Sequence, residues 1–265
     1  MNQEFRELVW QKGRELYRDM PWRDDTRPYF ALVSELMLQQ TQVDRVVPKF
    51  EGFITAFPDE MSLAQASLAD VLKHWQGLGY NRRAKYLHEA AKKIVTEFKG
   101  EFPSTFDDLV SLPGVGKNTA GAILAYSFNQ PAIFIETNIR TVYLHHFFHD
   151  GTTIHDREIV ALLEATIDPE HPREWYWALM DYGNFLKRSG RGRLQQSKHY
   201  KKQTPLKGSV REVRGQIITA LASHDMTRVQ LSQQLRADAR FESALSGLMK
   251  DGLVEESADK LHLTK

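Results

Sequence analysis

Cysteine is absent from all 265 residues of the chain. This absence excludes disulfide bonds, thiolate nucleophiles, zinc sites built on thiolates and iron–sulfur clusters held by cysteine. No other metal site is indicated, because the adjacent His145 and His146 would diverge on a helix. We therefore predict a protein that works without a cofactor.

Long hydrophobic runs are also missing. No uninterrupted apolar stretch approaches the roughly 20 residues that are needed to cross a bilayer. The N-terminal segment MNQEFRELVWQKGRELYRDM carries charges throughout and does not resemble a secretion signal. These two absences predict a cytoplasmic protein that has no membrane partner.

Charge of one sign is not in excess, since the net charge is +1. The basic residues are nevertheless unevenly distributed. One stretch, with Glu212 as its only acid, contains Lys187, Arg188, Arg191, Arg193, Lys198, Lys201, Lys202, Lys207, Arg211 and Arg214. These side chains can neutralise phosphates. A solvated basic linker explains the same composition, and the sequence leaves both interpretations open.

Helical spacing of apolar residues dominates the chain up to about residue 186, as in Leu87, Ala90 and Ile94. Prolines and glycines divide this part into short helices, with breaks at Pro58, 77–81, 100–103 and 112–116. The predicted fold class is all-α, in the form of a compact group of short helices. A stretch that is poor in apolar residues, 189–208, marks a domain boundary.

Beyond this boundary the pattern predicts a small domain of three helices and a two-stranded hairpin. The helices are marked by Val213, Ile217, Ile218 and Leu221, by Val229, Leu231 and Leu235, and by Phe241, Leu245, Leu248 and Met249. Strands at 253–254 and 261–263 flank a turn at 257–260. This order is typical of a winged helix, a module that binds DNA in some proteins and protein in others.

The most specific local motif is LPGVGKNTAGAI at 112–123, which follows a helical pattern at 106–111. Gly114 and Gly116 allow a tight backbone turn, and the N–H groups that begin the next helix can donate to a phosphate. Lys117 adds a positive charge there. An ordinary helical hairpin also needs glycine, but the whole motif favours a helix-hairpin-helix that binds a DNA backbone.

A second motif, VSELMLQQTQV at 33–43, is apolar around most of a helix circumference. Glu35, Gln39 and Gln42 form one polar stripe on it. Such a stripe usually faces water. If it lines a cleft instead, partial burial raises the pKa of Glu35 and lets this residue donate a proton. Periodicity does not separate the two interpretations.

A third candidate is Glu136, which follows the extended apolar run 131–135. Thr137 or Asn138 is expected to cap the helix that begins there. The helix dipole favours an ionised carboxylate at that end, which suits Glu136 to stabilise a developing cation. A plain capping interaction is the simpler interpretation of this segment.

Several segments together resemble one known family in their order and spacing. They are PWR at 21–23, VSELMLQQTQV at 33–43, WQGLGYNRRA at 75–84, LH at 87–88, LPGVGKNTAGAI at 112–123 and ETNIR at 136–140. Over roughly residues 20–186 the chain is similar to the helix-hairpin-helix DNA glycosylases, and among them to the MutY adenine glycosylase branch. The resemblance implies one helical subdomain at 1–25 plus 135–205 and a six-helix subdomain at 26–134. The pattern of helices and hairpin described above adds the winged-helix-like domain at 206–265.

The family swings its target nucleotide out of the duplex into a pocket between two helical subdomains. The resemblance assigns residues to each part of this task. Glu35 matches the acid that protonates the departing base, Asn138 supports the sugar site, Trp22 and Arg23 fall in the base pocket, and Gln39, Gln40 and Tyr80 fill or probe the duplex. The backbone clamp comprises Gly114, Gly116, Lys117, Asn118 and Thr119, and a monovalent cation can bind at Leu112 and Gly114. The implied partner is double-stranded DNA with a mismatch or lesion, bound by a monomer.

Breaking the bond between base and deoxyribose generates an oxocarbenium-like sugar, which needs an acid on the base and an anion beside the sugar. The resemblance makes Glu35 and Glu136 the candidates for these catalytic roles. Bifunctional relatives carry a lysine nucleophile where this chain has Asn118. Base removal without lyase chemistry is therefore implied.

The chain departs from the family at four places. Glu136 stands where the family has a catalytic aspartate, and a misplacement of about 1 Å can cost roughly a hundredfold in rate. Asn81 replaces a second tyrosine. The cysteines of the usual iron–sulfur cluster are missing, so segment 186–202 must pack without it. The winged-helix-like domain replaces the one that recognises 8-oxoguanine.

These departures leave the target base and the base opposite it open. An adenine glycosylase is favoured by the similarity around Glu35. The same chemistry on uracil, mismatched thymine or hypoxanthine is a second hypothesis. A non-catalytic protein that binds DNA lesions is a third.

Overall fold

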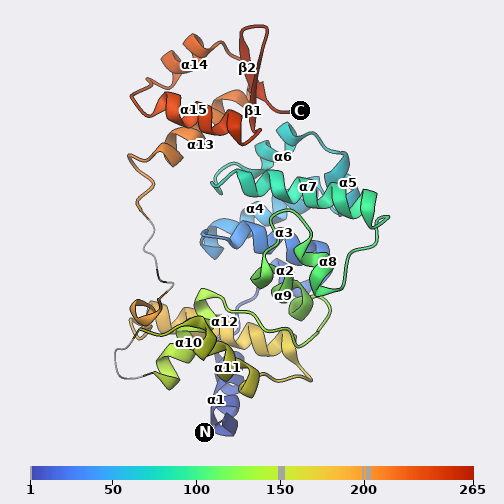
Figure 1. Cartoon of the computed structure of the whole chain (residues 1–265), viewed down its shortest axis with the longest axis vertical. Helices are drawn as coiled ribbons and strands as arrows, with labels where there is room; N and C mark the ends of the chain where they lie inside the picture. The colour runs from blue at the N-terminus through green and yellow to red at the C-terminus, as the bar shows by residue number, and fades with distance from the viewer. Residues whose placement is uncertain (1, 149–152, 199, 201–203) are drawn as a thin grey trace. The chain divides into compact units, whose positions relative to one another are not determined.

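The computed structural model describes residues 2–148, 153–198, 200 and 204–265 (Figure 1). Helices dominate these residues, and the sheet among them has two short strands. The predicted all-α class is thereby confirmed. The chain divides into two compact units: unit 1 contains residues 1–32, 104–111 and 115–202, and unit 2 contains residues 33–103, 112–114 and 203–265.

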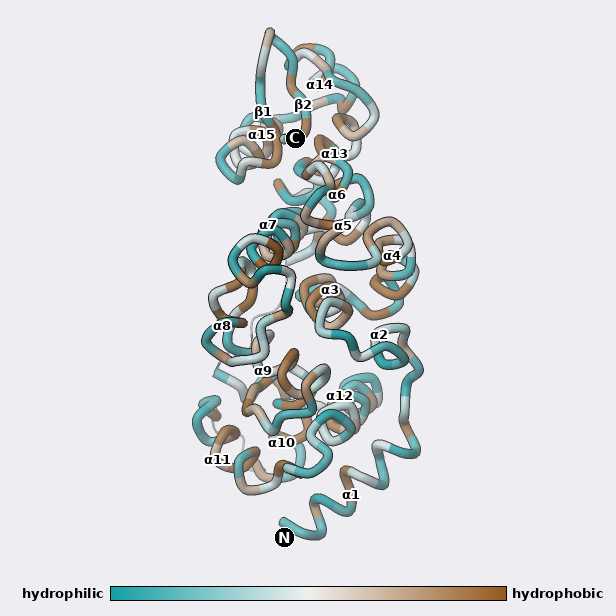
Figure 2. Tube along the Cα trace, turned by 90° about the vertical axis from the view of Figure 1, so that its right-hand side faces the viewer, coloured by the Kyte–Doolittle hydropathy of each residue, from teal (hydrophilic) through white to brown (hydrophobic). Residues whose placement is uncertain are grey.

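Unit 1 is built from helices that surround an aromatic core. Its elements are α1 (Asn2–Glu15), α2 (Pro21–Asp24), the start of α3 (Pro28–Leu38), α8 (Phe106–Val110), α9 (Lys117–Tyr126), α10 (Thr137–Phe147), α11 (Asp156–Thr166), α12 (Pro172–Arg188) and the 3-10 helix η1 (Leu194–Gln196). Hydrophobic residues gather along α9 (Figure 2). In the core, the ring centroids of Phe134 and Tyr176 lie 4.1 Å apart, and Trp175 is fully buried. α10 and α12 pack closely and position the carboxylates described below.

The first part of unit 2 has its own helical core. Its elements are the rest of α3, α4 (Val43–Ala56), α5 (Glu60–Gln65), α6 (Leu68–Trp75) and α7 (Arg82–Glu97). The rings of Phe53 and Trp75 pack edge to face there, with centroids 6.0 Å apart. The predicted break at Pro58 is followed by Asp59, which starts α5 with a capping box to Ser62.

The last part of unit 2, residues 209–265, is called the C-terminal module below. Its elements follow the predicted order: α13 (Val210–Leu221), α14 (Arg228–Gln234), α15 (Phe241–Lys250), β1 (Val254–Ser257) and β2 (Lys260–Leu263). Val229 was expected on the apolar face of the second helix of the module. This prediction is wrong, because Val229 is 65% exposed. Its β-branched side chain lies on the outer face of α14, where the pattern of the helix offers it no buried neighbours.

The hairpin of the module has a two-residue turn. The strands are antiparallel, in register from Val254 with Leu263 to Ser257 with Lys260. Ala258 and Asp259 have φ values of 48° and 60°. Left-handed backbone at both central residues matches the twist of the strands in such hairpins. The predicted hairpin is therefore present, with its turn at the predicted place.

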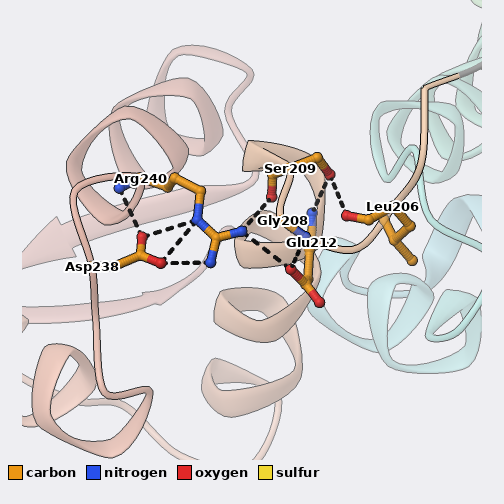
Figure 3. A network of polar contacts seen from close by, with 6 residues as sticks. All are labelled: Leu206, Gly208, Ser209, Glu212, Asp238 and Arg240. Carbon is orange, nitrogen blue, oxygen red and sulfur yellow. Dashed lines mark hydrogen bonds and ion pairs between the residues drawn. The ribbon is translucent and has the colours of Figure 1, made fainter.

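A charge network joins the beginning of α13 to the residues before α15 (Figure 3). Arg240 Nη2 lies 2.5 Å from Asp238 Oδ2, and Arg240 Nη1 lies 3.2 Å from Glu212 Oε2. The guanidinium also donates to the carbonyl of Ser209 at 3.3 Å, while Glu212 accepts the N–H of Gly208 at 2.8 Å. The hydrogen bonds from Arg240 lower the pKa of Asp238 to about 2.

The segment after α12 in unit 1 is held by backbone hydrogen bonds. The N–H of Ile154 donates to the carbonyl of Gln196 at 2.8 Å, and the N–H of Lys198 donates to the carbonyl of Ile154 at 3.1 Å. The side chain of Arg193 adds a hydrogen bond from its Nη1 to the carbonyl of Phe148 at 3.0 Å. These bonds lie in the segment that was expected to pack without a metal cluster.

The basic stretch predicted between positions 187 and 214 belongs to two units. Lys187 and Arg188 end α12 in unit 1, whereas Arg211 and Arg214 lie in α13 of unit 2. Lys201 and Lys202 lie outside the described residues. Across the described part of the chain, none of the helices has the length and apolar character of a membrane span.

Candidate active site

Glu35 lies in α3 among apolar side chains. Val33, Leu36 and Met37 are fully buried, and Glu35 itself is only 8% exposed. The interpretation in which this residue faces water is therefore wrong. The other interpretation, in which Glu35 lines a cleft, stays a prediction.

The predicted polar stripe of Glu35, Gln39 and Gln42 is wrong in its length. α3 ends at Leu38, and Gln40 has a left-handed backbone with φ 56°, so the chain turns before α4 begins. Gln42 therefore lies beyond the end of the helix, whereas the N–H of Gln39 still donates to the carbonyl of Glu35 at 3.2 Å. No proline or glycine marks this helix end, and periodicity alone could not locate it.

Arg83, in the first turn of α7, is a buried cation that joins two backbone turns of unit 2. The residue is 7% exposed. Its Nη1 donates to the carbonyls of Leu36 (2.6 Å), Met37 (2.8 Å) and Gln39 (2.6 Å), and its Nη2 donates to those of Leu78 (3.2 Å) and Gly79 (2.9 Å). Desolvation by burial lowers the pKa of Arg83 to about 10, an effect that nearby Tyr80 opposes. The end of α3 and the turn before α7 are therefore fixed by one side chain.

Tyr80 ends the second of these turns. Its φ is 48° and that of Gly79 is 70°, and a tyrosine is uncommon in this backbone region. Trp75 Nε1 donates to the carbonyl of Gly79 at 3.2 Å, and the guanidinium carbon of Arg83 lies 5.5 Å from the centroid of the Tyr80 ring. Two predicted duplex-probing residues, Gln39 and Tyr80, are thus brought together by contacts with Arg83.

Sequence reasoning missed Arg83, although a signal for it exists. Arg83 shares a helix face with Leu87, Ala90 and Ile94, all of which α7 buries. The side chain of the neighbouring Arg82 is 57% exposed. A charged residue on the apolar stripe of a helix was the feature that could have identified it.

The predicted hairpin lies between α8 and α9. Gly114 has φ +78°, and a Cβ atom there would lie 2.8 Å from the Cβ of Tyr86, so the turn requires glycine. Gly116 is the N-cap of α9 and offers no side-chain cap, and Lys117 beside it is exposed. An exposed helix N-terminus beside a lysine has the features of a phosphate site.

Asn118 has a structural contact in addition to its predicted place in the clamp. Its Nδ2 donates to the carbonyl of Ile135 at 2.9 Å, and its Oδ1 accepts the N–H of Ile135 at 3.4 Å. Thr119 beside it is 8% exposed. Asn118 therefore fixes the extended segment that leads to Glu136.

Glu136 is itself the N-cap residue of α10, where Thr137 or Asn138 was expected. It has an extended backbone, with φ −106° and ψ 170°, and makes no side-chain cap hydrogen bond. Thr137 and Asn138 are already helical, so they occupy the first turn. The Glu136 side chain is half-buried at the positive end of the helix dipole.

Asn138 is held where α10 crosses α12. A Cβ atom on Gly183 would lie 2.2 Å from the carbonyl oxygen of Asn138, so only glycine allows this approach. The Oδ1 atom of Asn138 is buried and has no hydrogen-bond partner among the described residues. Most buried acceptors in proteins have a hydrogen-bond partner, so this atom is a candidate to bind water or a ligand.

Arg23, predicted for the base pocket, forms a buried ion pair with Asp181 in unit 1. Arg23 Nη1 donates to Asp181 Oδ2 at 2.7 Å, and Arg18 Nε donates to Asp181 Oδ1 at 2.6 Å. Asp181 is 2% exposed, and the Arg23 guanidinium lies over the ring of Trp177. Trp22 is half-buried beside it in α2. Asp181 was missed from the sequence because its partner Arg23 lies 158 residues away.

An open cavity of about 410 Å³ is lined in part by Arg18, Asp181 and Arg188. At the end of α12, the pKa of Lys187 is lowered, first by desolvation and then by the charge of Arg18, while Glu136 acts in the opposite direction. Lys187 therefore places a positive charge within electrostatic reach of Glu136.

No group of three or more histidine, cysteine, aspartate or glutamate side chains suited to a metal ion occurs within the described residues. The cysteine-ligated cluster of the resembled family has no ligands in this chain, which contains no cysteine. The monovalent cation expected at Leu112 and Gly114 stays a prediction.

Comparisons with known proteins identify relatives of the chain. The model of the HhH-GPD superfamily base excision DNA repair proteins matches residues 33–169. The adenine DNA glycosylase of Mycolicibacterium smegmatis is 34% identical over 265 residues, which cover 91% of this chain and 89% of that protein. The adenine DNA glycosylase of Buchnera aphidicola subsp. Baizongia pistaciae is 36% identical over 64% of this chain. The match spans only 48% of the Buchnera protein's own length.

Solved structures show the same fold. A thermostable thymine-DNA glycosylase matches with a TM-score of 0.64 and 21% identity, over 73% of this chain and 91% of that chain. A trapped covalent intermediate of endonuclease III with DNA matches with a TM-score of 0.58 and 20% identity, over 77% and 90% of the two chains. The predicted glycosylase fold is thereby confirmed.

Proposed function

The chain belongs to the HhH-GPD superfamily of base excision DNA repair proteins, and from this premise we propose that it is a monofunctional DNA glycosylase. Its substrate is a mispaired or damaged base, with adenine favoured, in double-stranded DNA. The observation that carries the proposal is the burial of Glu35 in an apolar helix. A carboxyl group in such surroundings suits the protonation of a departing base.

Glu136 and Asn138 serve the sugar in this proposal. Glu136 sits at the N-terminus of α10, where the helix dipole favours its anionic form beside a developing oxocarbenium ion. The buried Oδ1 of Asn138 supplies an acceptor for the nucleotide. The Asn118 side chain donates to the protein backbone at Ile135 and offers no amine. This supports hydrolysis of the glycosidic bond without a lyase step.

The pair of Arg23 and Asp181, together with Trp22, forms the proposed base pocket. A carboxylate accepts hydrogen bonds and a guanidinium donates them, so the proposed pocket contains both kinds of group, which here bind each other at 2.7 Å. Adenine carries an amino donor and ring nitrogen acceptors that suit such a pair.

DNA contacts complete the proposal. Gly114, Gly116 and Lys117 clamp the backbone, with Asn118 and Thr119 behind them, and Gln39, Gln40 and Tyr80 probe the duplex. The division into subdomains at 1–25 plus 135–205, 26–134 and a winged-helix-like domain at 206–265 is part of the same proposal. So are a monomeric state, a cytoplasmic location and the lack of a cofactor.

Base release under single-turnover conditions tests the proposal. The duplexes carry adenine opposite 8-oxoguanine, adenine opposite guanine, uracil, thymine opposite guanine, or hypoxanthine. The wild type is expected to release adenine, and Glu35→Gln is expected to lose at least about a hundredfold in rate. Glu51→Gln, an exposed change in α4, is the matched control and should retain the rate.

Release of another base would replace adenine as the substrate and keep the enzyme class. Tight duplex binding without release from any substrate would overturn the catalytic proposal. It would favour the lesion-binding hypothesis, with Glu136 in place of aspartate as the cause. Release that is equally fast in Glu35→Gln would remove Glu35 from its role.

A further inference from the structure

The side chain of Tyr80 in unit 2 is contacted by a residue of the C-terminal module. The guanidinium carbon of Arg211, in the first turn of α13, lies 4.9 Å from the centroid of the Tyr80 ring. Arg211 Nη1 donates a hydrogen bond to the Tyr80 hydroxyl. Its Nη2 donates to the carbonyl of Thr204 at 3.0 Å, a second contact that holds the guanidinium. The ring and the hydroxyl of Tyr80 are therefore both engaged by Arg211.

A second group of contacts seats the module on α7, next to Tyr80. Asp251, the C-cap residue of α15, accepts from Arg214 Nη2 at 2.5 Å and lies 3.6 Å from Arg82 Nε. Its carbonyl accepts from Lys85 Nζ at 2.9 Å. Arg82 and Lys85 belong to the first turns of α7, which begins two residues after Tyr80. These contacts keep the first turn of α13 beside the Tyr80 ring.

The module has little positive charge on the elements that a winged helix commonly presents to DNA. The ends of α15 carry Glu242 and Lys250, and Glu242 pairs with Arg228 at 2.9 Å. Strand β1 has the sequence VEES. Affinity for DNA depends on neutralising phosphates, so this composition favours a module that acts through its contacts with Tyr80 and α7 over one that binds DNA by itself.

We propose that Arg211 is a positioning residue for Tyr80, and that the C-terminal module takes part in duplex probing through this contact. The inference rests on the proposed function, in which Tyr80 probes the duplex beside the extruded nucleotide. A ring that is oriented before DNA arrives loses less side-chain freedom on binding. Removal of Arg211 therefore weakens the step that uses Tyr80 and leaves the acid Glu35 unchanged.

A double-mutant cycle tests this positioning role. Wild type, Arg211→Ala, Tyr80→Ala and the double variant are compared in the single-turnover rate of base release and in the Kd for the same duplex. Arg211→Ala is expected to weaken one or both by roughly tenfold in the wild-type background, the scale of a cation–π contact with a hydrogen bond. In the Tyr80→Ala background the same substitution should have no further effect.

An equal loss in both backgrounds would overturn the inference. It would make Arg211 a phosphate contact, and the slope of log K against log salt concentration would then fall by about 0.9. Tyr80→Phe keeps the ring and removes the hydroxyl, so it is expected to show a smaller loss that disappears when Arg211 is absent. If Arg211→Ala fails to fold, Arg211→Lys takes its place in the cycle, because it keeps the positive charge and removes the planar guanidinium.

Arg228→Ala is the matched control, since it removes the same charge from the same module. Its partners are Glu242 and Glu256, both inside the module. Base release and Kd should stay at wild-type values. A loss equal to that of Arg211→Ala would assign the effect to the charge of the module and overturn the role of the Tyr80 contact.

The proposed function and this inference fail in different ways. If the wild type releases no base, the proposed function falls, and the cycle is carried out on the Kd for a duplex with a stable abasic-site analogue. Coupling between Arg211 and Tyr80 in that Kd would support the inference. Its absence would overturn the inference as well.

Discussion

Unit 2 buries the guanidinium of Arg83 against carbonyl oxygens, whereas unit 1 buries that of Arg23 against the carboxylate of Asp181. Both arginines are almost inaccessible, at 7% and 6% exposed. Only Arg23 meets an opposite charge there. Arg83 is therefore stabilised by the dipoles of backbone carbonyl groups, and Arg23 by the charge of a carboxylate.

The difference determines what each arginine can hold in place. Carbonyl groups from several segments bind different N–H groups of Arg83, so this side chain sets the path of two backbone turns. It does so without full compensation of its charge, since desolvation lowers its pKa to about 10. Arg23 fixes mainly one partner, Asp181, and keeps a charged acceptor inside the proposed base pocket.

Asp181→Asn is expected to have the largest effect. It leaves Arg23 and the partly buried Arg18 without their counter-charge, and breaking a buried pair costs about 3–5 kcal/mol. The free energy of unfolding in urea measures this loss. Asp25→Asn, which removes an exposed pair with Arg27, should cost less than about 1 kcal/mol. Equal losses in the two variants would show that Arg23 does not depend on its carboxylate.

Arg83→Lys is expected to cost about 2 kcal/mol, because one ammonium group cannot donate to both turns at once. The rate of base release should fall as well, since Gln39 and Tyr80 lose their common support. The exposed Arg45→Lys is the control and should stay within about 0.5 kcal/mol of the wild type. Wild-type stability in Arg83→Lys would mean that charge, and not the number of donors, is what the turns require.

Gly183→Ala probes the backbone contact that holds the proposed sugar site in unit 1. The added Cβ would lie 2.2 Å from the Asn138 carbonyl oxygen, so α10 and α12 must separate. Overpacking of this kind costs about 1–3 kcal/mol. Gly52→Ala meets open space in α4 and is expected to stabilise by about 0.5–1 kcal/mol. Unfolding curves and rates of base release are measured on both variants. If Gly183→Ala keeps the wild-type rate, the proposed sugar site does not depend on the close crossing of α10 and α12.

Local signals in the sequence predicted much of the fold. Periodicity located the buried face of α7, and Gly114 marked a turn that its positive φ and its contact with Tyr86 require. The burial of Glu35 stayed open, because a helical pattern does not reveal what a polar face meets. The end of α3 at Leu38 was missed, since no helix-breaking residue stands there.

The supporting residues of the site were less accessible to prediction. Asp181 meets Arg23 across 158 positions, and nothing in either local segment indicates the other. Arg83 binds backbone carbonyl groups. Every residue has one, so the sequence does not indicate which residues are its partners. Long-range contacts with backbone atoms are therefore the part of this site that required the structure.

The smallest effect is expected for an arginine–carboxylate pair that is exposed, that of Arg240 and Asp238 in the C-terminal module. The pKa of Asp238 is lowered from 3.8 to about 2 by hydrogen bonds from Arg240. A lowered folded-state pKa means that the contact stabilises the fold above about pH 4, and that this contribution is lost as the pH falls toward about 2. The Tm of Asp238→Asn should therefore lie slightly below that of the wild type at neutral pH, and the difference should shrink on acidification. About 1 M salt should also reduce it, because the pair is exposed. A difference in Tm that changes with neither pH nor salt would mean that Asp238 acts through the shape of its loop and not through its charge.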